Sequence, residues 1–283
     1  MFCDFSSPID NYIRLTLGDF MKIKSLAFVL VFFLIPTFCY SSVIDCLEAT
    51  CVILKQVEAE VEITTTDKDG KVKKEKKKQL QLRVGTGILF HEDEKHVYIL
   101  TAGHVVEGYK TLHTLFFKTG LPSPVMEVKV LLKKYKKDTI EDVAIVTVEK
   151  KAFGKYPIPK PIPLAAKGEE VKAKQRLISA GCPGGRWPNA FIGAAMIVGK
   201  DAYRFIPRPL KGRSGSGVFD EDGTKILGVI IWAGQMDGVA ITTDYIYRLL
   251  GNNLPPKVKE PEKADEEEVE EPPKEPAISI ELD

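Results

Sequence analysis

The sequence has no excess of charge of either sign, which limits the partners it is expected to have. Its 283 residues include 40 Lys and Arg against 39 Asp and Glu, so the formal net charge is +1. Overall charge therefore gives no reason to expect a nucleic acid or an anionic membrane surface as a partner. Apolar residues make up 44% of the chain, which is ordinary for a soluble protein of one large domain or two small ones.

Histidine and cysteine are also scarce, and they are not spaced as metal ligands. There are four histidines and five cysteines, and no pair has the spacing of a zinc site. His91 and His96 are five residues apart in HEDEKH, which does not place them on one face of a helix. This stretch is predicted to be the charged turn of a hairpin. No glycine-rich loop ends in Lys followed by Ser or Thr, so neither a metal nor a cofactor is expected.

Cys46 and Cys51 leave two alternatives open. They are five residues apart and can close a small disulfide loop if the protein is exported, or both can remain free thiols. Cys182 is then unpaired, and it is predicted to be a small buried side chain. Cys3 and Cys39 are expected to be removed with an N-terminal signal.

No apolar run near the N-terminus reaches the length of an ordinary membrane span. From Met21 onward, Lys22 and Lys24 precede an apolar block of 14 residues, Ser25–Phe38. This order is typical of a secretory signal peptide. We predict that translation begins at Met21 and that cleavage follows Ser41, so that residues 1–41 are an extension and a signal. The protein is then periplasmic or secreted, and the alternative is a membrane anchor formed by residues 25–38.

Residues 42–254 are predicted to form one all-β domain. Their short apolar runs, broken by glycine, proline and charge, favour a sandwich or a barrel over a parallel α/β sheet. One short helix is expected from about Thr243 to Leu250, with Gly251 as its stop signal. The predicted strands are Val84–Phe90, Val97–Thr101, Glu127–Leu132, Val143–Val148, Arg176–Ala180, Phe191–Val198 and Ile226–Trp232.

A hairpin arm is predicted ahead of these strands. Thr64–Thr66 and Gln79–Arg83 are expected to pair around Asp67–Gly70, which has the Asp-Gly chemistry of a turn. The lysine-rich run Lys73–Lys78 lies in this arm. Because no aromatic residue interleaves the charges, the run is predicted to be a solvated surface and not a nucleic-acid site.

Residues 255–283 differ abruptly in composition from the rest of the chain. They contain 11 acidic and four basic residues and are rich in proline. Such a segment cannot bury enough apolar surface to fold alone, so a disordered acidic tail is predicted. Its last residues, Ala277–Leu282, regain some apolar character. No internal repeat and no second folded module is expected.

Three stretches far apart in the chain carry residues that suit the hydrolysis of an amide. His104 lies in LTAGHVVEG, Asp142 directly precedes the strand Val143–Val148, and Ser214 lies in the glycine-dense GRSGSG. Amide hydrolysis needs a nucleophile, a base and donors for an oxyanion. We predict Ser214 as the nucleophile, His104 as the base and Asp142 as the group that orients the ring. The amides of Gly212 and Ser214 are predicted to form the oxyanion hole.

In these stretches the sequence resembles the chymotrypsin-fold (trypsin-like) serine peptidases, and most closely the bacterial Deg or high-temperature-requirement branch. The resemblance covers about residues 84–250 and rests on GTGILF, YILTAGHVV, EDVAIVTV, ISAGCPGG, GRSGSGVF and ILGVIIWAG. It implies two six-stranded antiparallel β-barrels with the active site in the cleft between them. His104 and Asp142 would come from the first barrel, and Ser214 from the second.

Two positions depart from the pattern of this family. Arg213 stands before the serine, where Asp or Asn is common, and Ser216 replaces a glycine. In the trypsin branch that Asp pairs with a new N-terminus released by zymogen cleavage, and Arg213 cannot make such a pair. No activation sequence precedes Gly85 either. The protein is therefore expected to work without trypsin-type activation, and whether its oxyanion loop is preformed stays open.

The resemblance also implies which residues bind the substrate. Arg208 and Lys211 would form one wall of the primary specificity pocket. Asp237 is the only acid in these stretches, so a preference for Lys or Arg is not expected. A small apolar side chain is favoured, with an acidic one as the alternative. The strand that pairs with the substrate and the far side of the pocket would consist of Ile231, Trp232, Ala233, Gly234, Gly238 and Val239.

The sequence thus predicts a serine endopeptidase that cleaves proteins or peptides through an acyl-enzyme intermediate. The alternative is a protein of the same fold with weak or no activity that holds a peptide or a partner in its cleft. Only Arg213 and Ser216 favour this alternative. The sequence gives no prediction of the oligomeric state.

Overall fold

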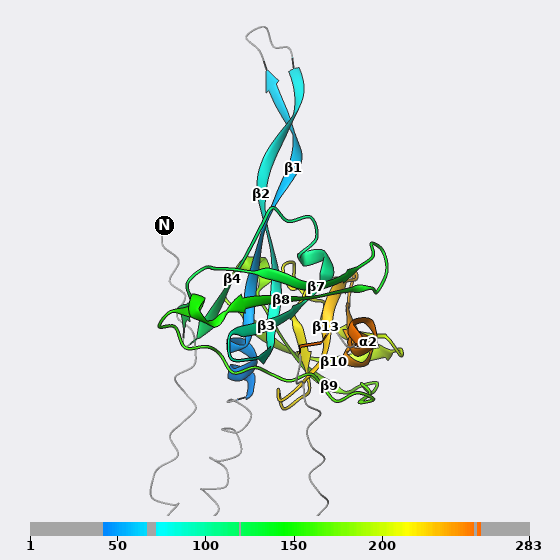
Figure 1. Cartoon of the computed structure of the whole chain (residues 1–283). Helices are drawn as coiled ribbons and strands as arrows, with labels where there is room; N and C mark the ends of the chain where they lie inside the picture. The colour runs from blue at the N-terminus through cyan, green and yellow to red at the C-terminus, as the bar shows by residue number, and fades with distance from the viewer. Residues whose placement is uncertain (1–41, 67–71, 119, 252–253, 256–283) are drawn as a thin grey trace, which may run out of the picture. The chain divides into compact units, whose positions relative to one another are not determined.

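The structure, a computed structural model, describes residues 42–66, 72–118, 120–251 and 254–255. The predicted signal segment, the turn of the arm and the acidic tail lie outside these ranges. Within them the chain is almost entirely β, with helical residues 42–48 at the start and one further α-helix near the end (Figure 1). None of the helices in the described ranges has the length and apolarity that crossing a membrane requires.

The first half of the chain forms one curved sheet of eight strands. These are β1 (Thr50–Thr66), β2 (Val72–Glu92), β3 (His96–Thr101), β4 (Thr111–Lys118), β5 (Leu121–Pro122), β6 (Met126–Glu127), β7 (Lys129–Tyr135) and β8 (Asp142–Glu149). Their order is β5-β4-β1-β2-β3-β8-β7, and β6 pairs with β4. β6 therefore lies at one end of the sheet, while β7, which begins two residues later, lies at the other.

This sheet corrects the expectation of two closed six-stranded barrels. The chain between β6 and β7 brings the two ends of the sheet near each other, but among the described strands no ladder joins β4 to β7. The physical reason is the shortness of β6, which makes only the pairs His113↔Glu127 and Thr114↔Met126 with β4. The first sheet is therefore curved and open.

The second half of the chain forms the closed barrel that the sequence predicted. Its strands are β9 (Arg176–Gly181), β10 (Asn189–Val198), β11 (Ala202–Ile206), β12 (Gly217–Phe219), β13 (Ile226–Ala233) and β14 (Gly238–Thr242). Each pairs with its neighbours in the cyclic order β10-β11-β14-β13-β12-β9. The predicted helix follows directly as α2 (Thr243–Leu250), where the Thr242 hydroxyl accepts a hydrogen bond from the Tyr245 amide.

The two sheets share one large apolar cluster, and the barrel holds a second cluster of its own around Tyr203 and Phe205. Ile88 and Ile145 from the first sheet lie in the same buried cluster as Phe219 from the barrel and Ile246 from α2. β8 is almost wholly buried, which explains its nearly continuous apolar sequence, DVAIVTVE. A carboxylate at the first position of this strand therefore lies at the edge of the core, where it needs hydrogen-bond donors.

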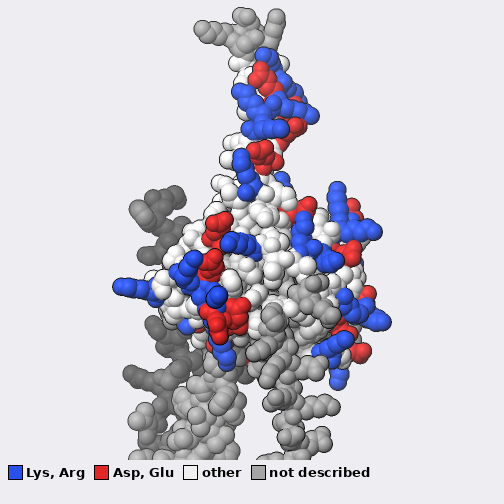
Figure 2. All heavy atoms as spheres, in the orientation of Figure 1, with Lys and Arg blue, Asp and Glu red and all other residues white. Residues whose placement is uncertain are grey.

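β1 and β2 extend beyond the sheet as a two-stranded arm (Figure 1). β4 accompanies β1 only as far as the pair Gln56↔Thr111, whereas the β1–β2 ladder continues to Thr66↔Val72. The arm was predicted, but its register differs: Thr64 pairs with Lys74, because the lysine-rich run is itself part of β2. Figure 2 shows basic and acidic side chains mixed along the arm, and Lys74 lies 3.1 Å from Glu62.

Candidate active site

The imidazole of His104 and the carboxylate of Asp142 are in direct contact. Nδ1 of His104 lies 2.6 Å from Oδ2 of Asp142, and the His104 amide donates to Oδ1 at 2.8 Å. Asp142 is 1% exposed, whereas the His104 side chain is 32% exposed. An ionised carboxylate only accepts hydrogen bonds, so Nδ1 carries a proton and Nε2 of the neutral ring is left as an acceptor. The ring is thus oriented from the buried side.

Gly103 allows this close approach. A Cβ atom at this position would lie 2.9 Å from Cβ of Tyr135, 3.0 Å from the Lys134 oxygen and 3.2 Å from Oδ1 of Asp142. Any side chain would push the 3₁₀ helix η1 (Gly103–Val105) away from β7 and β8. The glycine of TAGH is therefore required by packing against the end of β7 and the carboxylate of Asp142.

Lys55 holds the histidine loop from the other side, and no sequence pattern indicated it. Its Nζ donates to the backbone oxygens of His104 at 2.8 Å and Glu107 at 2.9 Å. Burial lowers the pKa of the Lys55 ammonium. The only available signal was its place in β1, where the strand alternation directs a lysine inward beside buried Val57.

Gly215 brings the serine loop against the histidine loop. A Cβ on Gly215, whose φ is +87°, would lie 2.1 Å from the Thr86 oxygen and 3.0 Å from the Ala102 nitrogen. The Thr86 amide in turn donates to the oxygen of Ser214 at 2.8 Å. The residue after Ser214 is therefore next to the backbone of Ala102, two residues before His104. Within the described part of the chain, no hydrogen bond joins the Ser214 hydroxyl to the His104 ring.

The peptide before Gly212 has a defined direction. The Arg213 amide donates to the Leu210 oxygen at 3.2 Å, and Gly212 has φ +94°, which is the geometry of a type II turn. The Lys211 oxygen accepts from the Gly184 amide at 2.9 Å. Because the C=O and N–H of a trans peptide point in opposite directions, the Gly212 amide points away from Gly184. Among the described residues, neither the Gly212 amide nor the Ser214 amide has a hydrogen-bond acceptor.

Arg213 fixes this turn from inside the barrel. Its Nη2 donates to the Asn189 backbone oxygen at 2.8 Å and to the Asn189 side-chain oxygen, and Nη1 lies 3.4 Å from the Ser179 oxygen. Its guanidinium stacks 4.6 Å above the Phe191 ring. Arg213 is 2% exposed, and burial lowers its pKa to about 10. The residue before the serine is thus anchored on β9 and β10 of its own barrel, and all hydrogen-bond partners of its side chain among the described residues belong to these two strands.

A pocket of about 320 Å³ opens beside Ser214. Of the residues predicted to bind the substrate, four line it: Arg208, Lys211, Trp232 and Ala233. Pro209, Leu210, Gly212, Ser214 and Ile230 complete the lining.

The other four predicted residues lie elsewhere. Ile231 is 1% exposed and belongs to the core. Gly238 stands behind the wall, since a Cβ there would lie 2.7 Å from Cδ of Pro209. Gly234 and Val239 do not line the pocket.

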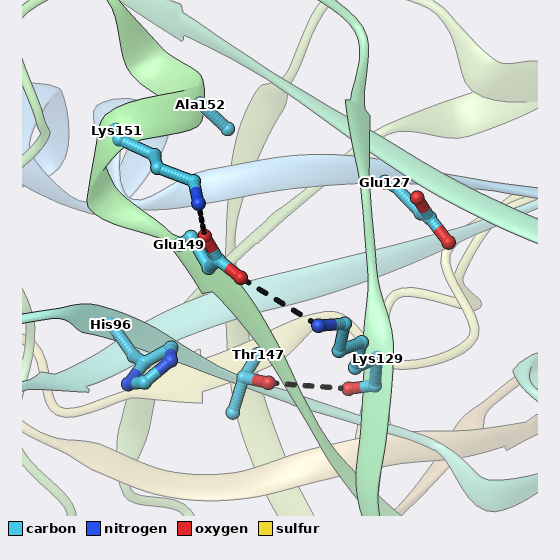
Figure 3. Close-up of a pocket in the computed structure, with 7 residues that line it drawn as sticks. All are labelled: His96, Glu127, Lys129, Thr147, Glu149, Lys151 and Ala152. Atoms are coloured by element: carbon cyan, nitrogen blue, oxygen red, sulfur yellow. Dashed lines mark hydrogen bonds and ion pairs between the residues drawn. The ribbon is translucent and has the colours of Figure 1, made fainter.

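A second hollow, of about 260 Å³, lies on the first sheet (Figure 3). It is beside Thr147 and Glu149, at the opposite end of β8 from Asp142. His96, Glu127, Lys129, Thr147, Glu149, Lys151 and Ala152 line it. Its main charges neutralise one another, because Glu149 lies 3.6 Å from Lys129 and 2.5 Å from Lys151 (Figure 3). None of the residues predicted to be catalytic lines this hollow, so it gives no alternative reaction centre.

The three cysteines in the described ranges are free and buried. Of the two alternatives for Cys46 and Cys51, the structure therefore shows free thiols. Burial raises the pKa of each to about 12, and it raises the pKa of Cys182 well above its ordinary value. Cys182 is fully buried, as predicted. None of the three has the exposure or acidity of a nucleophilic thiol.

Comparisons with known proteins agree with the family that the sequence resembles. A family model described as a trypsin-like peptidase domain matches residues 85–229, a segment that contains His104, Asp142 and Ser214. No curated protein sequence matches the chain.

Solved structures show the same fold. The active form of the Rv3671c protease from M. tuberculosis superposes with a TM-score of 0.51 at 21% identity, covering 76% of this chain and 85% of that one. The serine endoprotease from Yersinia pestis superposes with a TM-score of 0.53 at 14% identity, and the match covers 76% of this chain and 67% of that one. The protease Deg5 superposes with a TM-score of 0.51 at 16% identity, and the match covers 75% of this chain and 92% of that one.

Proposed function

Because this chain belongs to the trypsin-like peptidase family, we propose that it is a serine endopeptidase that cleaves peptide bonds with His104, Asp142 and Ser214. The observation that carries the proposal is the contact of 2.6 Å between Nδ1 of His104 and the buried carboxylate of Asp142. It leaves Nε2 as the proton acceptor of a ring whose loop packs against that of Ser214. A serine next to an oriented base is the arrangement that nucleophilic catalysis requires.

The proposed reaction has two halves. The Ser214 hydroxyl oxygen attacks the substrate carbonyl while Nε2 of His104 takes its proton, and the carbonyl oxygen becomes an oxyanion. When the C–N bond breaks, His104 gives that proton to the leaving amine, and an acyl-enzyme remains on Ser214. Water then attacks the ester with His104 again as the base, which releases the acid and regenerates the hydroxyl. Asp142 stabilises the imidazolium in both halves.

The oxyanion hole is proposed to be preformed. The amides of Gly212 and Ser214 have no acceptor among the described residues, and the hydrogen bond from the Gly184 amide to the Lys211 oxygen fixes the direction of the Lys211–Gly212 peptide. Donors that are already oriented need no rearrangement when the negative charge develops. Since Arg213 is anchored on its own barrel, we infer that no zymogen-type cleavage is used. An enzyme that became active only after N-terminal trimming would contradict this.

β13 is proposed to bind the substrate backbone. Its Trp232 and Ala233 pair with Val239 and Gly238 of β14 on one side. On the other side, β12 pairs with β13 only up to Val229, and among the described strands none continues beyond it. An extended peptide can add to such an edge, with its cleaved bond directed toward Ser214. Protein or peptide substrates are therefore expected.

Export remains a proposal that rests on the sequence of residues 21–41. Mass spectrometry of the mature protein tests it. A mature N-terminus directly after Ser41 supports export, whereas a mature chain that retains residues 25–38 in a membrane fraction supports the anchor.

Labelling with a fluorophosphonate probe tests the catalytic assignment. The probe should label the wild type on Ser214, and Ser214→Ala should remove the label without loss of the fold. Asp142→Asn should lower kcat by about 10⁴, because the amide no longer fixes the ring as the carboxylate does. A folded wild-type protein that neither takes the label nor cleaves any peptide would favour the protease-like binding protein instead.

A further inference from the structure

The pocket beside Ser214 carries two cationic side chains and no acidic one. Arg208 and Lys211 both line it, and the remaining seven lining residues are uncharged. We propose that this pocket selects substrates with a glutamate or aspartate immediately before the cleaved bond. The proposal rests on the proposed peptidase function and names its substrate class.

Both cations are available to a ligand. The only hydrogen bond of Arg208 in the described part of the chain is a long one, 3.4 Å from Nη1 to the Gln235 oxygen. A guanidinium has five N–H donors, so most of them stay free for a carboxylate, which Arg binds well in a forked geometry. The Lys211 ammonium forms no ion pair with any described residue, although the Lys211 backbone oxygen is bound by Gly184.

The one acid that the sequence places near this pocket is already neutralised. Asp237 lies 2.8 Å from Nη1 of Arg204 and is not a lining residue. Its carboxylate therefore does not offset the charge of Arg208 and Lys211. The pocket presents an uncompensated positive field to whatever enters it.

The walls of the pocket also suit the apolar part of an acidic side chain. Pro209, Leu210 and Trp232 give apolar surface against which the methylene groups of a glutamate can pack. A small apolar side chain is the alternative that the sequence favoured because Ala233 and Val239 would suit it, and of these two only Ala233 lines the pocket. A methyl group alone would leave most of the 320 Å³ and both cations without a partner.

Four peptides that differ only in the residue before the cleaved bond test the proposal with the full-length chain. That residue is Glu, Gln, Ala or Lys. Glu and Gln have nearly the same shape, so their ratio of kcat/KM isolates the charge. We expect a Glu:Gln ratio of about 10 or more at low salt, and a smaller ratio at high salt, because exposed charges are screened. The Lys peptide should be the poorest substrate.

Variants of the two cations locate the selectivity. Arg208→Gln and Lys211→Gln should each lower the Glu:Gln ratio, and Arg208→Glu should raise kcat/KM for the Lys peptide relative to the Glu peptide. Lys160→Gln removes an exposed lysine that does not line the pocket, so it serves as the matched control and should leave the ratio unchanged.

The outcomes separate this proposal from the proposed function. A wild type that takes the fluorophosphonate label and cleaves the peptides with a Glu:Gln ratio near one overturns the selectivity alone. A ratio that both Gln variants leave unchanged also overturns it. A wild type with no label and no cleavage overturns the peptidase function, and the selectivity with it.

Discussion

The backbone oxygen of Lys211 accepts a hydrogen bond from the Gly184 amide at 2.9 Å, and this contact decides where the next amide points. Gly184 belongs to η3 (Pro183–Gly185), which follows β9, whereas Lys211 lies just before the serine. Two loops of one barrel therefore orient the Gly212 N–H together. The free direction of that N–H, and the free amide of Ser214, are what the oxyanion of the proposed reaction needs.

Gly212→Ala should lower kcat by about 10²–10³, the usual cost of losing one oxyanion donor. A Cβ there would lie 2.6 Å from the Gly184 nitrogen, and φ is +94°, so the turn must rearrange. Steady-state kinetics should show the loss in kcat more than in KM. Gly120→Ala is the matched control, because Gly120 has φ +80° and open space around its Cα. Equal kcat in Gly212→Ala and the wild type would refute the assigned oxyanion hole.

Arg213→Met should lower kcat by about 10- to 100-fold with little change in KM. Hydrogen bonds to a charged group are worth about 1.5–3 kcal/mol, and this guanidinium holds the serine turn on Asn189. The rate of fluorophosphonate labelling should fall in parallel. Arg213→Lys keeps a charge but not the fork or the stacking on Phe191, so it should restore only part of the rate. An unchanged rate of labelling in Arg213→Met would show that the serine turn keeps its conformation without the Arg213 guanidinium.

Lys55→Met should reduce both stability and kcat. The substitution leaves the backbone oxygens of His104 and Glu107 without their donor, at a cost of about 1–3 kcal/mol in the free energy of unfolding. We expect kcat to fall by roughly 10-fold, as the histidine loop loosens. Lys110→Met removes only an exposed pair with Glu58 and should change stability by about 0.5 kcal/mol or less. Chemical denaturation and kinetics on both variants check the difference, and matching values would refute a positioning role for Lys55.

Stability should fall as the pH rises above about 9, partly because of the buried thiol of Cys51. In the unfolded chain this thiol loses its proton near 9.0, but in the folded protein its pKa is about 12. Between these values the unfolded state binds fewer protons, so the free energy of unfolding decreases by up to about 1.4 kcal/mol per pH unit. Urea titrations from pH 8 to 10.5 should show a shallower decline for Cys51→Ala. If the unfolding free energies of the wild type and Cys51→Ala fell equally with pH, the raised pKa of the Cys51 thiol would be refuted.

Much of the fold was predictable because it depends on local apolar patterns. Six of the seven predicted strand segments fall within single strands, and β3 and β8 agree to within one residue at each end. The seventh, Glu127–Leu132, is divided in the structure between β6 and β7, with a break at Val128. The arm was underestimated, since the outer part of β2, residues 73–79, consists only of Lys, Glu and Gln, which carry no apolar signal. Among the strands that were missed, β12 and β14 have three and five residues and begin with glycine, so they resemble turns. β4 and β11 were missed as well. The open edge of the first sheet depends on how the strands close in space, which no local pattern encodes.

The candidate site divides in the same way. The motif residues His104 and Asp142 were identified by their local contexts, and the structure brings them into contact. Lys55 and Gly184 were not identified, because each acts through a hydrogen bond to a backbone oxygen distant in the chain. The sequence showed the positive charge of the pocket in Arg208 and Lys211. Only the structure shows that Asp237 forms an ion pair with Arg204.

The β1–β2 ladder of the arm affects whether the enzyme can cleave its own arm. Glu58, Glu60 and Glu62 lie in an exposed extended strand, which is the shape and the side-chain chemistry that the proposed pocket takes. Each stands opposite a residue of β2 in an unbroken antiparallel ladder. A substrate bound to β13 as proposed is a single extended strand, so β1 would first have to leave its ladder with β2. We therefore expect the pairing within the arm to protect it from cleavage by another copy of the enzyme.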